Sequence, residues 1–457
     1  MFGRKKIKVR LAPSPTGYMH VGTAQSALYN WLFAKKNGGE FLFRIEDTDI
    51  ERSTKEYEQS ILEALEWLEL KWDGEVVHQS KRRIHYRRAL EKLITNKKAF
   101  WCNHTKEELE AERKEEEENK QPPRHICSCK SSSAFGRHYP ASNPGQNFIL
   151  RLAVNEQKIT FNDVIRGPIE FEASLLGDFS IAKSLDEPLY NFAVVVDDAE
   201  MGITHAIRGE DHISNTPKQI LIYEALGLPL PIFAHLPLIL APDRSKLSKR
   251  HGGMAVADYK KDYLPEALIN FLGGLSYTFS KEIISREEMV KEFDLTKVHK
   301  SGAVFDVKKL NWLNSQYIKK LPPKEFKNLT NLNISDAAAA LITERLERLM
   351  DAQEFSYLWS EPQYGKELLK WKNSGFEQVK ASLSRSLEVL KAAEMSREAI
   401  LAGLEKLSVE LGNKGLVFWP LRVALSGKEK SPDPIDIALA LGKQETIKRI
   451  EKAISLL

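Results

Sequence analysis

The chain has 457 residues, 42% of them hydrophobic and 28% charged, and its formal net charge is +4. This length predicts about three domains, and a charge so close to zero excludes a uniformly basic surface, so nucleic-acid binding would need a local basic stripe. No apolar run reaches the ~18–20 residues that cross a membrane, and residues 1–6 do not lead into the apolar segment of a signal peptide. Three cysteines exclude a disulfide framework and favour a cytoplasmic protein.

The first fifty residues are predicted to fold as strand, loop, helix and strand. Residues 7–12 read as a short buried strand and Phe41–Ile45 as a second one. Between them, apolar side chains at helical spacing run from Thr23 to about Asn37, where two glycines supply a stop. Strands joined through a helix are expected to be parallel neighbours.

The loop before that helix carries the first candidate ligand-binding residues, His20 and Gly22. A helix N-terminus presents unpaired N–H groups and a partial positive charge, which suit a phosphate group. The loop has neither of the common glycine-rich phosphate motifs, and taken alone an ordinary turn with a surface histidine explains it equally well.

The rest of the chain alternates between strand and helix patterns. Helices are predicted over Ser53–Trp67, Lys81–Lys97 and the Glu-rich, solvated Lys106–Lys120. Short strands are predicted over Phe148–Val154, Lys158–Asp163, Gly167–Glu172, Asn191–Val196, Ile203–Arg208 and His235–Leu240. A helix with Thr216 as its N-cap is predicted to end near Gly227. Beyond Leu264 the pattern is largely helical, and after the proline pair at 322–323 it is only helical.

Two further segments follow strand ends. Residues 209–212 come after a predicted strand, at the edge where open α/β sheets bind ligands. Residues 241–253 form a basic, Gly-ended loop that contains Lys246 and Lys249.

Together these motifs resemble class I aminoacyl-tRNA synthetases. The pair His20-Val-Gly-Thr23 and Lys246-Leu-Ser-Lys-Arg250 is similar to the family's "HIGH" and "KMSKS" signatures. The surrounding sequence is similar to bacterial glutamyl-tRNA synthetases over nearly the whole chain, in these segments: residues 10–17, 43–49, 189–198, 207–212, 312–314 and 420–424.

The resemblance implies a Rossmann-like α/β catalytic domain interrupted by an insertion that binds the tRNA acceptor end, then helical anticodon-binding domains. The expected boundaries are 1–100 and 188–240 for the catalytic halves, 101–187 for the insertion, 241–321 for a stem-contact region with the mobile basic loop, and 322–457 for the anticodon-binding part. The implied reaction first forms glutamyl-adenylate and pyrophosphate from L-glutamate and ATP, with Mg²⁺, and then passes the glutamyl group to the 3′ end of tRNA(Glu). This subfamily typically binds tRNA before it activates the amino acid, and it is usually monomeric.

The resemblance also implies residue roles. In adenylation a carboxylate attacks the α-phosphate, so catalysis is mostly positioning and electrostatic stabilisation. The residues implied for catalysis are His20, Lys246 and Lys249. ATP is expected to contact these three and also Gly22, Asp211 and Ile239. Glutamate is expected to contact Arg10, Ala12, Ser14, Glu46, Tyr190 and Arg208, since guanidinium groups suit carboxylates.

Several alternatives stay open on sequence alone. Lys246 and Lys249 would be ordinary surface charges in the absence of His20, and structural ion pairs are the less favoured interpretation of Glu46 and Arg208. Rival functions are an enzyme that also charges tRNA(Gln), a glutaminyl-tRNA synthetase, a short paralogue that modifies a tRNA base, a non-catalytic binding relative and a small nucleotidyltransferase. The C-terminal helical pattern and the length disfavour most of these, and Arg345 and Arg348 are only guesses for anticodon contacts.

A structural Zn²⁺ site is predicted in the insertion. All three cysteines fall within 28 residues, and Cys102-x-His104 with Cys127-x-Cys129 supplies a closed Cys₃His set. It resembles the knuckle of some family members, with the histidine in a different position. His125 or His138 is an alternative to His104, and three unliganded buried thiols are the alternative to the metal.

Overall fold

The computed structural model describes residues 6–49, 51–121, 124–131, 148–155, 157–245, 247 and 255–457. By its internal contacts the chain divides into two compact units. The first unit contains residues 1–260 and 268–306, and the second contains residues 261–267 and 307–457. Among the helices described, none combines the length and the apolar character that a membrane crossing requires.

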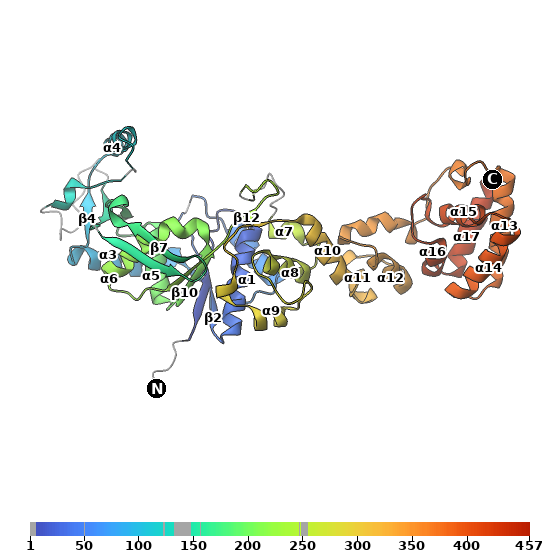
Figure 1. Ribbon diagram of the computed structural model, residues 1–457, viewed down its shortest axis with the longest axis horizontal. Coiled ribbons are helices and arrows are strands. Elements are labelled where there is room, and N and C mark those ends of the chain that lie inside the picture. The colour runs from blue at the N-terminus through green and yellow to red at the C-terminus, as the bar shows by residue number, and fades with distance from the viewer. Residues whose placement is uncertain are drawn as a thin grey trace. The chain divides into compact units, whose positions relative to one another are not determined.

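The first unit mixes helices and strands, coloured blue to yellow in Figure 1. Its strands are β1 (Lys8–Leu11), β2 (Glu40–Ile45), β3 (Val77–His78), β4 (Ala99–Cys102), β5 (Ile149–Leu152), β6 (Lys158–Asp163), β7 (Gly167–Glu172), β8 (Ser180–Ser184), β9 (Glu187–Pro188), β10 (His205–Gly209), β11 (Ile232–Leu236), β12 (Ile239–Leu240) and β13 (Ala303–Val304). Its helices are α1 (Val21–Lys36), α2 (Lys55–Trp67), α3 (Arg83–Thr95), α4 (Lys106–Glu118), α5 (Tyr190–Glu200), α6 (Thr216–Leu226), α7 (Val256–Tyr259), α8 (Pro265–Leu275, whose first turn belongs to the second unit) and α9 (Arg286–Glu292).

Parallel strands form the part of the first unit that carries the predicted site. β1 pairs with β2 in parallel, as the strand–helix–strand pattern predicts, and β10 pairs with β11 in parallel. Thr204 N, just before β10, donates to Lys8 O of β1 at 2.9 Å, so the two pairs adjoin. α1 is mostly buried against these strands. The carboxyl ends of β1, β2 and β10 thereby meet at one edge.

The segment between the two parallel regions is antiparallel. β4, β5, β8 and β9 form one sheet, and β6 and β7 form a hairpin with one buried and one exposed face. α4 begins with a capping box at Thr105 and buries none of its side chains, which confirms that its Glu run is solvated. β5, β6 and β7 agree with the predicted strands within one or two residues.

Three expectations were wrong in detail. Asn191–Val196 was predicted to be a strand, but it lies in α5, which is buried around almost its whole circumference. Such a helix has no polar stripe, so its valine run imitates a buried strand. His235–Leu240 was predicted as one strand, but Pro237, which has no N–H to donate, separates β11 from β12.

The third difference concerns Thr216, predicted as the N-cap of α6. The N-cap is Asn215, Thr216 is the first helical residue, and α6 ends at the left-handed Gly227 as expected. The hydroxyl of Thr216 accepts instead from Arg208. A local capping pattern cannot show that a distant arginine occupies the hydroxyl.

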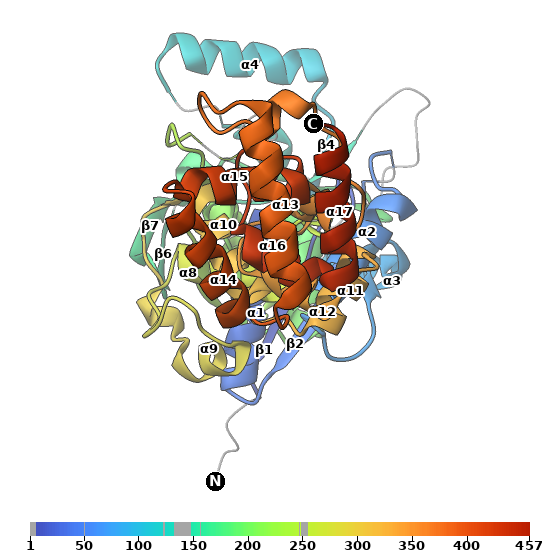
Figure 2. The ribbon, with the colours of Figure 1, turned by 90° about the vertical axis from the view of Figure 1, so that its right-hand side faces the viewer.

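The second unit, orange to red in Figures 1 and 2, contains helices and no strand among its described residues. This confirms the helical pattern predicted beyond residue 322. Its helices are α10 (Val307–Ile318), α11 (Pro323–Thr330), α12 (Asp336–Thr343), α13 (Phe376–Ala392), α14 (Arg397–Glu410), α15 (Lys414–Ser426), α16 (Pro434–Leu441) and α17 (Lys443–Ser455). Buried leucines such as Leu383, Leu387, Leu390 and Leu404 belong to its core.

Candidate active site

His20 is the N-cap of α1, at the carboxyl end of β1. Its Nδ1 accepts from the backbone N–H groups of Gly22 at 3.2 Å and Thr23 at 3.3 Å. Because Nδ1 is an acceptor, the proton of the neutral ring is on Nε2, on the exposed side chain. His20 therefore satisfies two helix-terminal N–H groups, and its protonated Nε2 lies 3.1 Å from Thr23 Oγ1 at the positive end of α1.

Gly22 leaves space for the His20 ring. A Cβ atom on Gly22 would lie 3.1 Å from His20 Nδ1 and 3.2 Å from its Cε1. The expected role of Gly22 was to let ATP approach the backbone, and the structure adds that it makes room for the His20 side chain.

The basic loop returns to the chain beside His20. Val256 N donates to Met19 O at 2.8 Å, and Ala255 forms a β-bridge with His20. At the start of the loop, Leu247 N donates to Ile239 O at 3.0 Å. Lys246 and Lys249 lie outside the described residues, but both described ends of their loop are anchored in the first unit, and one end touches His20.

Side chains from β1, β2 and α5 form a network of buried charges. The Arg44 guanidinium, with no solvent exposure, contacts Asp198 Oδ1 at 2.6 Å, Glu46 Oε1 at 2.9 Å and Asp197 Oδ2 at 3.8 Å. Arg10 Nε donates to the same oxygen of Asp198 at 3.1 Å. Burial alone would raise the pKa of Asp198, but the two guanidinium groups outweigh it and hold this pKa below its ordinary value.

Four of the residues predicted to bind glutamate gather around this network. Arg10 and Glu46 belong to it, and the pKa of the Tyr190 hydroxyl is raised mainly by burial and next by the charge of Glu46. The positive charges of Arg208 and Arg10 act on Tyr190 in the opposite sense. Burial also raises the pKa of Glu46, against the effect of Arg44. The structure thus brings Arg10, Glu46, Tyr190 and Arg208 together.

Arg208, at the end of β10, is buried but has neutral partners. Its Nη2 donates to Thr216 Oγ1 at 2.8 Å, its Nε donates to His235 Nε2 at 3.2 Å, and its guanidinium lies over the Phe233 ring at 5.6 Å. Within the described part of the chain, no carboxylate lies within 4 Å of it. Burial is the main reason that its pKa is below the ordinary arginine value.

The remaining predicted residues are less closely associated. Ala12 is half-buried and Ser14 is exposed, both in the loop after β1. Asp211 is exposed after β10, and Ile239 is buried in β12, where its carbonyl anchors the basic loop. These positions surround the same strand ends, and their roles stay predictions.

Sequence reasoning missed the residues that hold the predicted ones in place. Arg44 and Asp198 were noted only as parts of motifs, although a charged residue inside an apolar strand or at the end of a valine run is itself a signal of a buried ion pair. Asp163, Thr216 and His235 carry no such local signal, since only the fold brings them to Arg208.

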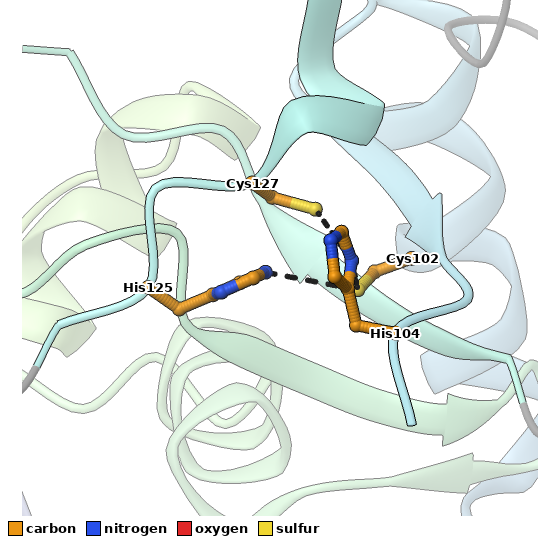
Figure 3. Close-up of side chains that lie close together, drawn as sticks. All are labelled: Cys102, His104, His125 and Cys127. Atoms are coloured by element: carbon orange, nitrogen blue, oxygen red, sulfur yellow. Dashed lines mark hydrogen bonds between the residues drawn. The ribbon is translucent and has the colours of Figure 1, made fainter. Parts of the chain in front are cut away.

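A second cluster contains potential metal ligands. One donor atom from each of Cys102, His104, His125 and Cys127 lies within 4.8 Å of all the others. Figure 3 shows the four side chains pointing toward a common centre, with contacts from His125 to Cys102 and from His104 to Cys127. Three of these were predicted as zinc ligands, and His125 was an alternative.

Two ligand sets are possible, because either Cys129 or His125 could be the fourth ligand beside Cys102, His104 and Cys127. Cys129 Sγ lies 3.8 Å from His104 Nδ1 and donates to Asn103 Oδ1 at 3.2 Å. His125 directs Nε2 to Cys102 and Nδ1 to the Glu112 carboxylate. A carboxylate on the second nitrogen of a histidine is the usual support of a zinc-bound imidazole. His138 lies outside the described residues.

Two known family models match the sequence of this chain. Residues 6–312 match the model described as tRNA synthetases class I (E and Q), catalytic domain, and residues 288–454 match an anticodon binding domain. The first match covers both the edge with His20 and the buried charges around Arg208.

Individual relatives are similar to this chain over nearly their full length. The chain is 41% identical to glutamate–tRNA ligase 2 of Thermoanaerobacter pseudethanolicus, over 99% of this chain and 98% of the relative, and 39% identical to glutamate–tRNA ligase of Heliobacterium modesticaldum, over 99% and 97%. The crystal structure of a glutamate tRNA ligase from Elizabethkingia meningosepticum, in complex with its amino acid, is similar with a TM-score of 0.88 at 34% identity and covers 99% of each chain. The chain therefore belongs to the class I tRNA synthetases of the E and Q group.

Proposed function

We propose that this protein is a glutamate–tRNA ligase, which uses ATP to form glutamyl-adenylate and then transfers the glutamyl group to tRNA(Glu). Members of this family take ATP, an amino acid and tRNA as substrates. The observation that carries the choice of glutamate is the buried Arg208 guanidinium, which has no carboxylate partner in the described part of the chain. A substrate with a side-chain carboxylate would supply the missing charge.

In this proposal the amino acid is held between opposite charges. Arg208 binds the side-chain carboxylate, and Arg10 with Tyr190 faces the other carboxylate. Glu46 accepts from the ammonium group, with Ser14 and Ala12 beside it. The reacting carboxylate is then fixed next to the edge with His20, and fixing its direction of attack lowers the barrier to adenylation.

The ATP half of the proposal rests on His20 and the basic loop. The Nε2–H of His20 would donate to the α-phosphate as negative charge builds there, next to the N-terminus of α1. Lys246 and Lys249 would bind the β- and γ-phosphates, and Asp211, Ile239 and Gly22 the nucleoside. Mg²⁺ bound with ATP would offset the charge of the phosphates.

We also propose that the protein acts as a monomer in the cytoplasm, with residues 101–187 at the tRNA acceptor end and the helical second unit at the anticodon. The closest rival is a glutaminyl-tRNA synthetase, whose anticodon part is expected to be a β-barrel. A second unit without strands among its described residues disfavours it. An enzyme that charges tRNA(Gln) as well as tRNA(Glu) is the alternative that the same pocket allows.

The direct test is ATP–pyrophosphate exchange with L-glutamate or L-glutamine, without tRNA and with purified tRNA(Glu) or tRNA(Gln). We expect exchange with glutamate only, and strong stimulation by tRNA(Glu). Exchange with glutamine would contradict the assigned amino acid, and charging of tRNA(Gln) with glutamate would identify the broader enzyme.

His20→Ala tests the proposed contact between His20 and the α-phosphate of ATP. It should lower the adenylation rate by about 10²- to 10³-fold, with little change in the KM for glutamate. Gly22→Ala is the matched variant, because it keeps the imidazole but forces its ring to move. A smaller loss of the same kind is expected from it. Near wild-type exchange by His20→Ala would show that His20 does not act on phosphate.

We further propose a structural Zn²⁺ at the cysteine–histidine cluster. The observation that favours it is two sulfur and two imidazole nitrogen atoms within 4.8 Å of one another, with the Glu112 carboxylate on the second nitrogen of His125. Cys102, His104 and Cys127 would be ligands, and either Cys129 or His125 would be the fourth. The metal would tie the end of β4 to the loop before Ser128.

Metal analysis of protein purified without added zinc should give about one equivalent, and Cys127→Ser should lose it. Cys129→Ser and His125→Ala compare the two candidates for the fourth ligand: the variant that loses zinc identifies it. Retention of full stability in chelator by a metal-free protein would remove the site.

A further inference from the structure

The orientation of Arg208 depends on two hydrogen-bond acceptors. Its Nε faces His235 Nε2 at 3.2 Å, and its Nη2 faces Thr216 Oγ1 at 2.8 Å. A guanidinium group is a donor at every nitrogen, so each partner must present a lone pair. For His235 this requires that Nε2 carries no proton.

Asp163 keeps the proton of His235 away from Nε2. Its Oδ2 lies 2.6 Å from Nδ1 of His235, whose side chain has no solvent exposure. A carboxylate at Nδ1 holds the ring proton there, and the neutral ring then offers the lone pair of Nε2 to Arg208. A protonated imidazole would direct an N–H at the guanidinium, and burial keeps the pKa of His235 below its ordinary value.

Asp163 itself is held in place by the backbone. Its Oδ1 accepts from Ile165 N at 3.0 Å and from Arg166 N at 2.8 Å, and its Oδ2 also accepts from His235 N at 3.1 Å. These contacts and the hydrogen bond to the His235 ring hold its pKa below the ordinary value, although burial acts the other way. The carboxylate therefore stays ionised and cannot rotate away from the histidine.

We propose that Asp163 and His235 are positioning residues that orient the Arg208 guanidinium for the side-chain carboxylate of the amino acid. The inference rests on the proposed function, in which Arg208 binds that carboxylate. Asp163 belongs to β6, in the segment predicted to be the insertion, and His235 belongs to β11. The orientation of Arg208 thus depends on a residue from outside the predicted catalytic halves.

Asp163→Asn tests the chain of contacts. An amide NH₂ opposite Nδ1 would favour the tautomer with its proton on Nε2, which faces the donor on Arg208. Loss of a hydrogen bond to a charged group predicts a rise in the KM for glutamate of roughly 10- to 100-fold in pyrophosphate exchange. The KM for ATP should change less than about twofold.

The double variant Asp163→Asn with His235→Gln separates positioning from simple destabilisation. The carbonyl oxygen of the introduced glutamine reaches the place of Nε2 and accepts from Arg208 whatever the tautomer. We expect it to recover most of the lost glutamate affinity. Glu58→Gln is the control, because it removes a carboxylate from another histidine, His78, in the same unit, and it should leave both KM values unchanged.

The outcomes are distinct from those of the proposed function. Absence of glutamate-dependent exchange in the wild type would remove the proposed function itself. With an active wild type, the inference is overturned if Asp163→Asn leaves the KM for glutamate unchanged, or raises both KM values equally, or is not improved by His235→Gln. A selective rise for glutamate that the second change reverses supports it.

Discussion

Two buried arginines of the first unit, Arg44 and Arg208, have opposite surroundings. The Arg44 guanidinium contacts carboxylates of Glu46, Asp197 and Asp198, two of them within 3 Å. The Arg208 guanidinium, with 7% of the residue exposed, contacts a hydroxyl and a neutral imidazole and lies over an aromatic ring. Both are at the carboxyl ends of parallel strands.

The difference is that Arg44 has carboxylate partners within the chain, whereas the partners of Arg208 are neutral. An unpaired buried charge is unfavourable, so it persists only where the fold fixes it and where a ligand restores the balance. Arg44 is compensated within the chain and orders the carboxylates around it. In the proposed function, Arg208 is compensated by the side-chain carboxylate of glutamate, and this is why we assign the selection of glutamate to it.

The largest effect is expected for the stability of an Arg44 variant. Arg44→Gln would leave Glu46 buried without its cation, while Asp198 would keep Arg10 and Asp197 would keep Arg82. We expect a cost of about 3–5 kcal/mol in the free energy of unfolding. Arg208→Gln removes a charge without a carboxylate partner and should change that free energy by no more than about 1 kcal/mol. Urea denaturation of both variants measures the difference, and equal losses would contradict the comparison.

The next effect concerns His212, whose ring accepts from the Tyr190 hydroxyl at 3.1 Å and faces Asn215. Burial and then the positive charge of Arg208 lower the pKa of His212 to about 4, and Arg10 adds to this effect. The negative charge of Asp211 acts in the opposite direction. The unfolded chain takes up this proton near pH 6.5 and the folded chain only near pH 4. Stability should therefore fall as pH drops from 6.5 to 4, by up to about 3 kcal/mol from this group.

Titration of the His212 ring by NMR checks this sign and its cause. Arg208→Gln should raise the pKa of His212, because a positive neighbour is removed, and saturating glutamate should also raise it in the wild type. An unchanged pKa in the variant would mean that the Arg208 charge does not act on this part of the pocket.

The smallest effect is expected for Thr216→Val, which removes the acceptor of Arg208 Nη2 while keeping the shape of the side chain. Loss of one hydrogen bond predicts a decrease of about three- to tenfold in kcat/KM for glutamate. Steady-state exchange kinetics measure it. No decrease would indicate that Nε and the Asp163–His235 pair alone hold the guanidinium.

The sequence predicts the elements that have a clear period or a motif. The β1–α1–β2 unit, the solvated α4 and the helical second unit follow from apolar spacing and charge. Asp47, within the motif segment 43–49, has a structural partner: it accepts from Ser80 N at 2.8 Å and from Ser80 Oγ at 2.6 Å. α5 was missed because burial around the whole helix removes the periodic signal.

The residues of the candidate site also fall into two groups, those that a sequence motif predicts and those that only the tertiary structure brings together. Residues within motifs, such as His20, Glu46 and Arg208, were found because the resemblance assigns them. Arg44 required knowledge that its strand is buried, and Asp163 and His235, 72 residues apart in the sequence, became partners only through the packing of β6 on β11. Partners of this kind follow from tertiary structure, which short-range patterns do not record.

The measurement that most directly tests the central claim is the ratio of kcat/KM for L-glutamate to that for L-glutamine in the wild type and in Arg208→Gln, by pyrophosphate exchange with tRNA present. We predict that the wild type strongly prefers glutamate. In the variant, loss of a buried ion pair should lower the value for glutamate by about 10³-fold and narrow the ratio. An unchanged ratio would contradict the role of Arg208 and assign selection to Arg10 or Tyr190.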